Sequence, residues 1–129
     1  MLDRARGLQR DLLSMQQPTR LLHGDLHHDN VVLDAARGWL AIDPKGVIGE
    51  PAYEVGAALR NPAGDPRWFA VPSILDRRAR IFAERLGLDV PRILAWGYAQ
   101  AVLAAVWAIE DGTDPAAGLA TAAALEALL

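Results

Sequence analysis

The stretch HGDLHHDN, residues 23–30, decides what fold and chemistry to expect of this chain of 129 residues. It is too polar and too irregular in its spacing for a helix or a strand, so we expect a loop. Two short apolar runs follow it, 31–33 and 39–42, and both predict strands. The five residues between them, 34–38, end in glycine and predict a hairpin loop.

Three side chains with hard oxygen donors are expected to converge at one end of this hairpin. Asn30 stands just before the first strand, and Asp43 stands just after the second. Antiparallel pairing brings the start of one strand beside the end of the next. Asp25 lies on the loop that enters the same end, so the sequence predicts that Asp25, Asn30 and Asp43 lie close together.

This combination of donors fits phosphoryl transfer better than any single motif does. Magnesium prefers carboxylate and amide oxygens and usually shares its coordination shell with substrate phosphates. In the kinase template an Asp accepts the hydroxyl proton, an Asn five residues later holds metal, and a later Asp holds metal as well. The spacing of Asp25, Asn30 and Asp43 reproduces that order.

Residues 21–61, LLHGDLHHDNVVLDAARGWLAIDPKGVIGEPAYEVGAALRN, resemble the catalytic core of the aminoglycoside phosphotransferases, which have the protein-kinase-like fold. Gly24 and His27 match the HGDxHxxN form of small-molecule kinases. The continuation IDPKG, GEP and YE, at 42–46, 49–51 and 53–54, is most similar to the streptomycin 6-kinase and hydroxyurea phosphotransferase branch.

The resemblance implies an activity and roles for three residues. Asp25 would be the catalytic base, and Asn30 and Asp43 would be ligands of Mg²⁺, with ATP as the phosphoryl donor. The acceptor would be a hydroxyl group of a small molecule such as an aminoglycoside or hydroxyurea, and the outcome would be antibiotic resistance.

Other polar residues of the segment admit two interpretations each. His23 is expected to hold the loop backbone through its ring nitrogens, and His27 either does the same or contacts substrate or phosphate. Glu54 either supports the catalytic loop or is a solvated helix residue. Lys45 either contacts phosphate or substrate or is an exposed loop lysine, and His28 is expected at the surface.

The chain departs from the family pattern in what precedes this core. No GxGxxG loop occurs, and the one lysine, Lys45, lies too close after Asp43 to be the distant strand lysine that contacts the nucleotide phosphates. We therefore expect residues 1–129 to form one domain, the C-terminal lobe of a longer kinase whose N-terminal nucleotide-clamping lobe is missing. Alone, it is expected not to bind ATP normally.

The rest of the sequence predicts an α+β fold that is mainly helical. Helices are expected at about 2–16, 52–60, 73–86, 89–110 and 115–128, with Gly87 ending the third and Asp89 capping the fourth. Residues 61–72 are expected to be irregular. The apolar run 93–109, interrupted by Gln100, is shorter than the about 20 residues of a membrane span and predicts a buried central helix.

The four tryptophans are expected in or partly in the core, except that Trp68 is a candidate for lining an acceptor pocket. A net charge of −3 without a basic run argues against nucleic-acid binding and is compatible with a cationic small molecule. The absence of cysteine excludes disulfides, zinc-binding thiolates and cysteine nucleophiles. The N-terminus lacks the apolar core of a signal peptide, so a cytoplasmic protein without a membrane partner is expected.

Two other functions remain open at this stage. A non-catalytic kinase remnant could bind an acceptor or a partner without transferring phosphate. A metal-dependent hydrolase could use His23, His27 and His28 as zinc ligands, although the glycine between the first two argues against the helix that such spacing needs.

Overall fold

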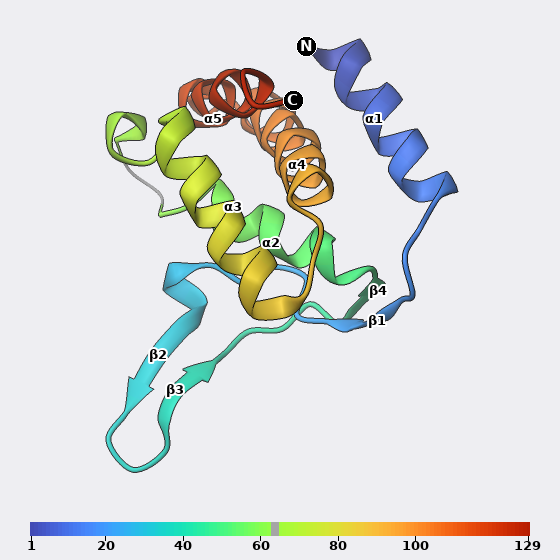
Figure 1. Ribbon diagram of the computed structural model, residues 1–129. Helices are drawn as coiled ribbons and strands as arrows, with labels where there is room; N and C mark the ends of the chain where they lie inside the picture. The colour runs from blue at the N-terminus through green and yellow to red at the C-terminus, as the bar shows by residue number, and fades with distance from the viewer. Residues whose placement is uncertain (63–64) are drawn as a thin grey trace.

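The computed structural model describes residues 1–62 and 65–129 as a mainly helical α+β fold with two small antiparallel sheets (Figure 1). Its helices and strands, in chain order, are α1 (Leu2–Ser14), β1 (Arg20–Leu22), β2 (Val31–Asp34), β3 (Gly38–Ala41), β4 (Val47–Gly49), α2 (Pro51–Leu59), α3 (Pro72–Leu86), α4 (Val90–Glu110) and α5 (Ala116–Glu126). Short 3₁₀ turns are present at His28–Asn30 and Pro66–Trp68.

Helix α4 is the centre of the fold, and α1, α2, α3 and α5 all pack against it. Asp89 caps its first turn by accepting a hydrogen bond from the Arg92 backbone N–H at 3.1 Å, as its position before Pro91 predicts. Within the described residues α4 is also the one helix long and apolar enough to cross a membrane. However, 56% of its apolar window is buried by the other helices, which supports the interpretation as a core helix.

The predicted helix boundaries agree with the structure to within about two residues. Gly87 ends α3 in the left-handed conformation, with φ of 66°, which glycine adopts without steric cost. Helix α1 buries Ala5 and Leu12, whereas Leu2 and Met15, at its two ends, are exposed.

The hairpin is confirmed, with Val31 opposite Ala41 and Asp34 opposite Gly38. Its turn is held by the Asp34 carboxylate, which accepts hydrogen bonds from the backbone N–H groups of Ala36 (3.0 Å) and Arg37 (2.8 Å). The hairpin projects away from the helices (Figure 1), so neither of its faces is fully covered.

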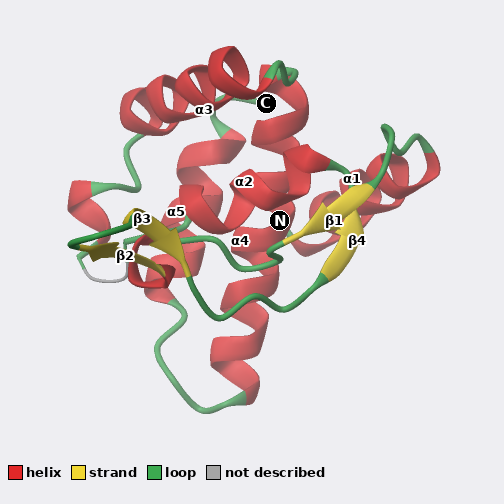
Figure 2. Ribbon diagram, turned by 90° about the horizontal axis from the view of Figure 1, so that it is seen from below, coloured by secondary structure: helices red, strands yellow, loops and turns green. Residues whose placement is uncertain are grey.

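Residues 43–51 are rich in glycine and proline and predict a loop, but the structure has strand β4 inside them, so that expectation was wrong. β4 pairs with β1 in the register Arg20 to Gly49 and Leu22 to Val47. Seen from below, this second small sheet and the hairpin lie at opposite ends of the molecule, with the loops that join them in between (Figure 2). The three residues of β4, of which the last is a glycine, are too few to carry a strand pattern of their own, and their partner is distant in sequence.

The expectation that the four tryptophans lie in or partly in the core was wrong for Trp39 and Trp68. Trp96 is buried, but Trp39 and Trp68 are 71% and 79% exposed and Trp107 is half exposed. Trp39 stands on the projecting hairpin and Trp68 on the short turn before α3, where no other element covers them.

Candidate active site

The loop 23–30 connects β1 to β2 and rests on helix α2 through Glu54. The Glu54 carboxylate accepts hydrogen bonds from the backbone N–H of Gly24, at 3.1 Å and 3.2 Å to its two oxygens, and of Leu26 at 3.3 Å. These N–H groups flank Asp25 on both sides. A charged acceptor makes such bonds stronger than neutral ones, so α2 fixes the backbone that carries Asp25.

Glycine is required at position 24 for two separate reasons. Its φ is +87°, in the region that L side chains rarely adopt. A Cβ placed there would also lie 2.7 Å from Cγ2 of Val47 on β4, which is closer than packed carbon atoms come. The loop therefore packs directly against the strand that the sequence did not reveal.

His23 ties this loop to the end of the hairpin. Its Nε2–H donates to the carbonyl oxygen of Ile42 at 2.7 Å, and its Nδ1 accepts from the backbone N–H of Asp25 at 3.4 Å. The carbonyl can only accept and the amide can only donate, so these bonds assign the neutral Nε2–H tautomer. The His23 carbonyl in turn accepts from the Lys45 backbone N–H at 2.7 Å, so residues on both sides of Asp43 bond to His23.

Asp25 is partly buried, and its carboxylate is oriented by a cation. Nη2 of Arg60 lies 3.1 Å from Oδ1 of Asp25, while Nε2 of His27 lies 3.6 Å from Oδ2. Arg60 is the residue that ends α2, so the same helix holds both the backbone around Asp25 and its side chain. Arg60 was not predicted as a site residue, because no motif marks an arginine at the end of a helix.

Asn30 is buried beside Asp25, as the spacing predicts. Its side-chain Nδ2 donates to the Asp25 carbonyl oxygen at 2.9 Å. This bond orients the amide group and does not use the side-chain oxygen, which can therefore serve as a metal ligand. The Ile42 backbone N–H donates to the Asn30 carbonyl at 2.9 Å. The hairpin register thus brings Asn30 next to the residue that precedes Asp43.

Asp43 follows β3 in a left-handed conformation, with φ of 56°, and its carboxylate is exposed. Nζ of Lys45 lies 2.6 Å from Oδ2 of Asp43. This hydrogen bond lowers the pKa of Asp43 and raises the pKa of Lys45. Neither interpretation of Lys45 anticipated this partner: its ammonium group holds the Asp43 carboxylate.

A cavity of about 240 Å³ opens beside Asp25. Its lining combines the loop and its supports with helices α2 and α4, and consists of Gly24, Asp25, Lys45, Tyr53, Arg60, Gln100, Leu103 and Trp107. Gln100 donates to the Tyr53 carbonyl oxygen at 2.7 Å. The signal for Gln100 was present in the sequence, because it is the polar residue that interrupts the apolar run of α4.

Trp68, the candidate for an acceptor pocket, does not lie in this cavity. It lines a separate one of about 290 Å³ together with Arg67. Trp107, which is expected in or partly in the core, takes that place beside Asp25. The difference arises because α4 extends its last turns past the helical core and presents Trp107 to the loop.

His27 holds the loop from within. Its Nδ1 accepts from the Asp29 backbone N–H at 3.3 Å, which leaves Nε2 facing the Asp25 carboxylate. Over residues 1–62 and 65–129, no three His, Asp or Glu side chains are grouped so as to hold a metal ion. The grouping that the zinc hypothesis needs around His23, His27 and His28 is therefore not formed.

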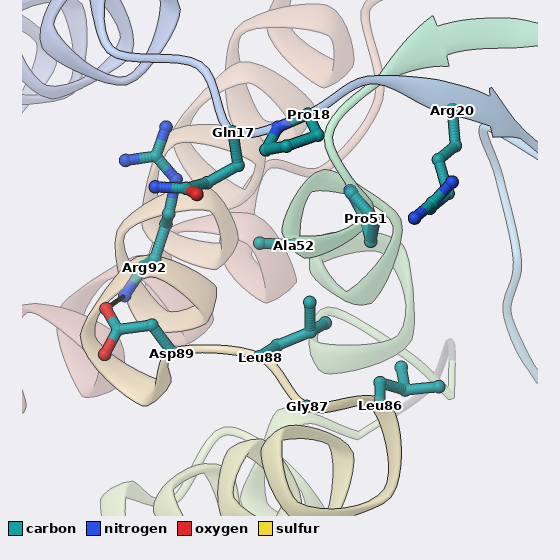
Figure 3. Close-up of a pocket in the computed structure, with 10 residues that line it drawn as sticks. All are labelled: Gln17, Pro18, Arg20, Pro51, Ala52, Leu86, Gly87, Leu88, Asp89 and Arg92. Atoms are coloured by element: carbon teal, nitrogen blue, oxygen red, sulfur yellow. Dashed lines mark hydrogen bonds between the residues drawn. The ribbon is translucent and has the colours of Figure 1, made fainter.

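A further cavity, of about 490 Å³, lies between the segment before β1, the start of α2 and the α3–α4 connection (Figure 3). Figure 3 shows the Asp89 carboxylate meeting the Arg92 backbone at its edge. None of the site residues predicted from the sequence lines this cavity. The chemistry is therefore concentrated at the smaller cavity beside Asp25.

The chain matches a known family over most of its length. The sequence model of the aminoglycoside/hydroxyurea antibiotic resistance kinases matches residues 1–112. The chain belongs to this family of kinases.

Several individual kinases and phosphotransferases are similar to this chain. Streptomycin 3''-kinase of Klebsiella pneumoniae is 40% identical over 111 residues, which cover 84% of this chain and 42% of the relative. Streptomycin 6-kinase of Streptomyces glaucescens is 38% identical, with 76% and 33% covered. Hydroxyurea phosphotransferase of Kitasatospora aureofaciens is 39% identical, with 72% and 25% covered. The chain thus spans less than half the length of these relatives, and no solved structure matches it.

Proposed function

We propose that this chain is the catalytic, C-terminal lobe of a protein-kinase-like phosphotransferase that transfers phosphate from ATP to a hydroxyl group of a small molecule. The observation that carries the proposal is the pairing of Asp25 with Asn30. The Asn30 amide donates to the Asp25 carbonyl at 2.9 Å, while the Asp25 carboxylate faces a cavity of about 240 Å³. The family membership supports the reaction class.

Asp25 acts as the base that orients the acceptor hydroxyl and accepts its proton. Arg60 occupies Oδ1 of the carboxylate, so Oδ2 is the oxygen available to the acceptor. His27 stands beside that oxygen at 3.6 Å, and Glu54 and His23 hold the backbone on either side. In this assignment Arg60, Glu54 and His23 are positioning residues.

The donor set of Asn30 and Asp43 fits Mg²⁺, which is commonly bound by one or two protein oxygen ligands together with substrate phosphates. The Asn30 side-chain oxygen is not used by the hydrogen bond of its amide nitrogen, and the Asp43 carboxylate is exposed. When bound, the ion would neutralise phosphate charge. Lys45 balances the Asp43 carboxylate and lines the Asp25 cavity. This position supports the proposal that it contacts phosphate or substrate.

The acceptor is proposed to be a small polar molecule of the kinds named in the relatives, streptomycin or hydroxyurea. Tyr53, Gln100 and Trp107 give its cavity both hydrogen-bonding and aromatic surface. We assign the nucleotide clamp to a segment outside residues 1–129, because no GxGxxG loop occurs in them and Lys45 is held by Asp43.

The test measures transfer from radiolabelled ATP to streptomycin and to hydroxyurea with Mg²⁺, by the chain alone and by the longest product of its reading frame. Asp25→Asn should lower kcat by about a factor of 10³, with nucleotide affinity unchanged. Asp29→Asn is the matched control, because Asp29 is an exposed carboxylate of the same loop. Near-normal turnover by Asp25→Asn would remove Asp25 from this role. Streptomycin binding without transfer in any form would instead favour the kinase remnant.

A further inference from the structure

We propose that a second cavity, lined by the other half of the catalytic loop, binds a small aromatic anion, and that Arg78 recognises its carboxylate. Gly24 and Asp25 face the cavity proposed for the acceptor, whereas Leu26, His27 and His28 face this one. The proposal concerns a separate site and does not depend on phosphoryl transfer.

The cavity has a volume of about 590 Å³, within the range of sites for small organic ligands. Most of its wall is apolar and comes from three elements. The hairpin contributes Val31 and Trp39, helix α2 contributes Val55 and Ala58, and helix α3 contributes Phe82 and Leu86. A ligand with a flat hydrocarbon body would bury these surfaces from water.

Two charged side chains line this otherwise apolar cavity, Glu54 and Arg78. The Glu54 carboxylate accepts hydrogen bonds from the loop N–H groups of Gly24 and Leu26, whereas Arg78 is a cation. The Arg78 guanidinium donates to the backbone carbonyl oxygens of Asn61, at 2.8 Å, and of Ala58. Burial lowers the pKa of Arg78, since the charged form is poorly solvated there. In the part of the chain that the structure describes, no ion pair joins Arg78 to a carboxylate, whereas Arg60 and Arg92, also partly buried, are both paired with one.

Carbonyl dipoles reduce the cost of burying this charge but do not neutralise it. A carboxylate on the ligand would do so through a charge-assisted hydrogen bond, for which a guanidinium is well suited. A neutral ligand would gain only the apolar contacts. The charge of Arg78 therefore selects an anion over an uncharged molecule of the same shape.

Trp39 supplies the preference for an aromatic body. Its side chain borders an apolar cavity but is 71% exposed, so it is not held in place by packing in the core. Aromatic rings gain from stacking or edge contacts beyond the area they bury. Phe82 lies on the facing helix, so a flat ring can contact aromatic surfaces from both the hairpin and α3.

The test titrates the chain with 1-naphthoate and with its neutral counterpart 1-naphthalenemethanol, by calorimetry and by amide chemical shifts. We expect the acid to bind about tenfold more tightly than the alcohol, with shifts at Leu26, Val31 and Phe82. Arg78→Gln should abolish this preference and leave the affinity for the alcohol unchanged. Arg80→Gln is the matched control on the same helix, because Arg80 is exposed and paired with Asp76.

Two further variants keep the test decisive if Arg78→Gln unfolds, since Arg78 also holds the end of α2. Arg78→Lys retains the charge and should retain part of the preference, and Phe82→Ala should weaken both ligands alike. Equal affinity for acid and alcohol, or shifts confined to the Asp25 cavity or to Trp68, would overturn the proposal. Loss of acid binding in Arg80→Gln as well would also overturn the proposal, because the preference for the acid would then be a general charge effect and not recognition by Arg78.

Discussion

The carboxylate of Glu50 is completely buried, and the Arg92 guanidinium meets it with Nε at 2.8 Å from each oxygen. The Gln17 backbone N–H donates to the same carboxylate at 2.9 Å, and the Trp96 indole N–H donates to it as well. Arg92 also donates to the Met15 carbonyl at 2.8 Å. One ion pair thus joins the end of α1, the start of α2 and the first turns of α4.

Breaking this pair should destabilise the fold strongly. Glu50→Gln leaves the Arg92 cation buried without its counter-charge, which costs about 3–5 kcal/mol of unfolding free energy. Urea denaturation measures the loss. Asp76→Asn, which breaks the exposed Asp76–Arg80 pair, is the control and should change stability little. Similar values for the two variants would show that the buried pair does not hold the fold together.

Gly24→Ala and Gly38→Ala should differ although both replace a glycine with positive φ. At Gly38 a Cβ would meet nothing within 4 Å, so only backbone strain of about 1 kcal/mol is expected. At Gly24 the Cβ would also collide with Val47, and the total loss should reach about 2–4 kcal/mol. Thermal unfolding of the two variants compares them directly. Equal losses would mean that the loop does not pack against β4 as described.

Arg60 should act on turnover and not on nucleotide affinity, because it contacts the Asp25 carboxylate. In a form of the protein that carries out transfer, Arg60→Gln should lower kcat about tenfold with the KM for ATP unchanged. Arg60→Lys should recover part of the rate, since it keeps the charge but not the planar geometry. Arg85→Gln, an exposed arginine on α3, is the control. A rise in KM without a fall in kcat would contradict the positioning role.

The hairpin turn should loosen in acid. The backbone N–H groups of Arg37 and Ala36, and the Arg37 side chain, lower the pKa of Asp34 from 3.8. Because the folded state holds the proton less tightly than the unfolded chain, the carboxylate stabilises the turn above about pH 4. This contribution is lost as the pH falls through the lowered pKa.

Amide shifts and hydrogen exchange at Ala36 and Arg37, followed from pH 6 to pH 3, measure this effect. Asp34→Asn should remove the step, since an amide does not titrate in this range. Asp29→Asn, which changes an exposed carboxylate outside the turn, should leave it in place. Protection of Ala36 and Arg37 that is independent of pH in the unmodified chain would contradict the prediction.

Much of the fold was predictable because its signals are local. Gly87 and Asp89 mark the α3–α4 boundary through backbone conformation and capping, which depend on a few neighbouring residues. The hairpin follows from two short apolar runs around a turn, and its antiparallel register places Asn30 beside Ile42. This is why the approach of Asn30 to Asp25 could also be anticipated.

The supports of the site were not predictable in the same way. Arg60 reaches Asp25 only because α2 folds under the loop, and an arginine at a helix end carries no signal of its partner. Strand β4 exists only through its pairing with β1. Trp39 was expected in or partly in the core but is exposed, because hydrophobicity does not tell which face of an element remains uncovered.

The sequence by itself determined the helices, the hairpin and the identity of the residues that bear the expected chemistry, since periodicity, capping and spacing act over a few residues. Only the tertiary structure decided which charge meets which. Lys45 pairs with Asp43, Arg60 with Asp25 and Arg92 with Glu50, while Arg78 is left at an apolar cavity. These outcomes depend on the packing of distant segments, because burial and the distance between charges exist only once the chain has folded.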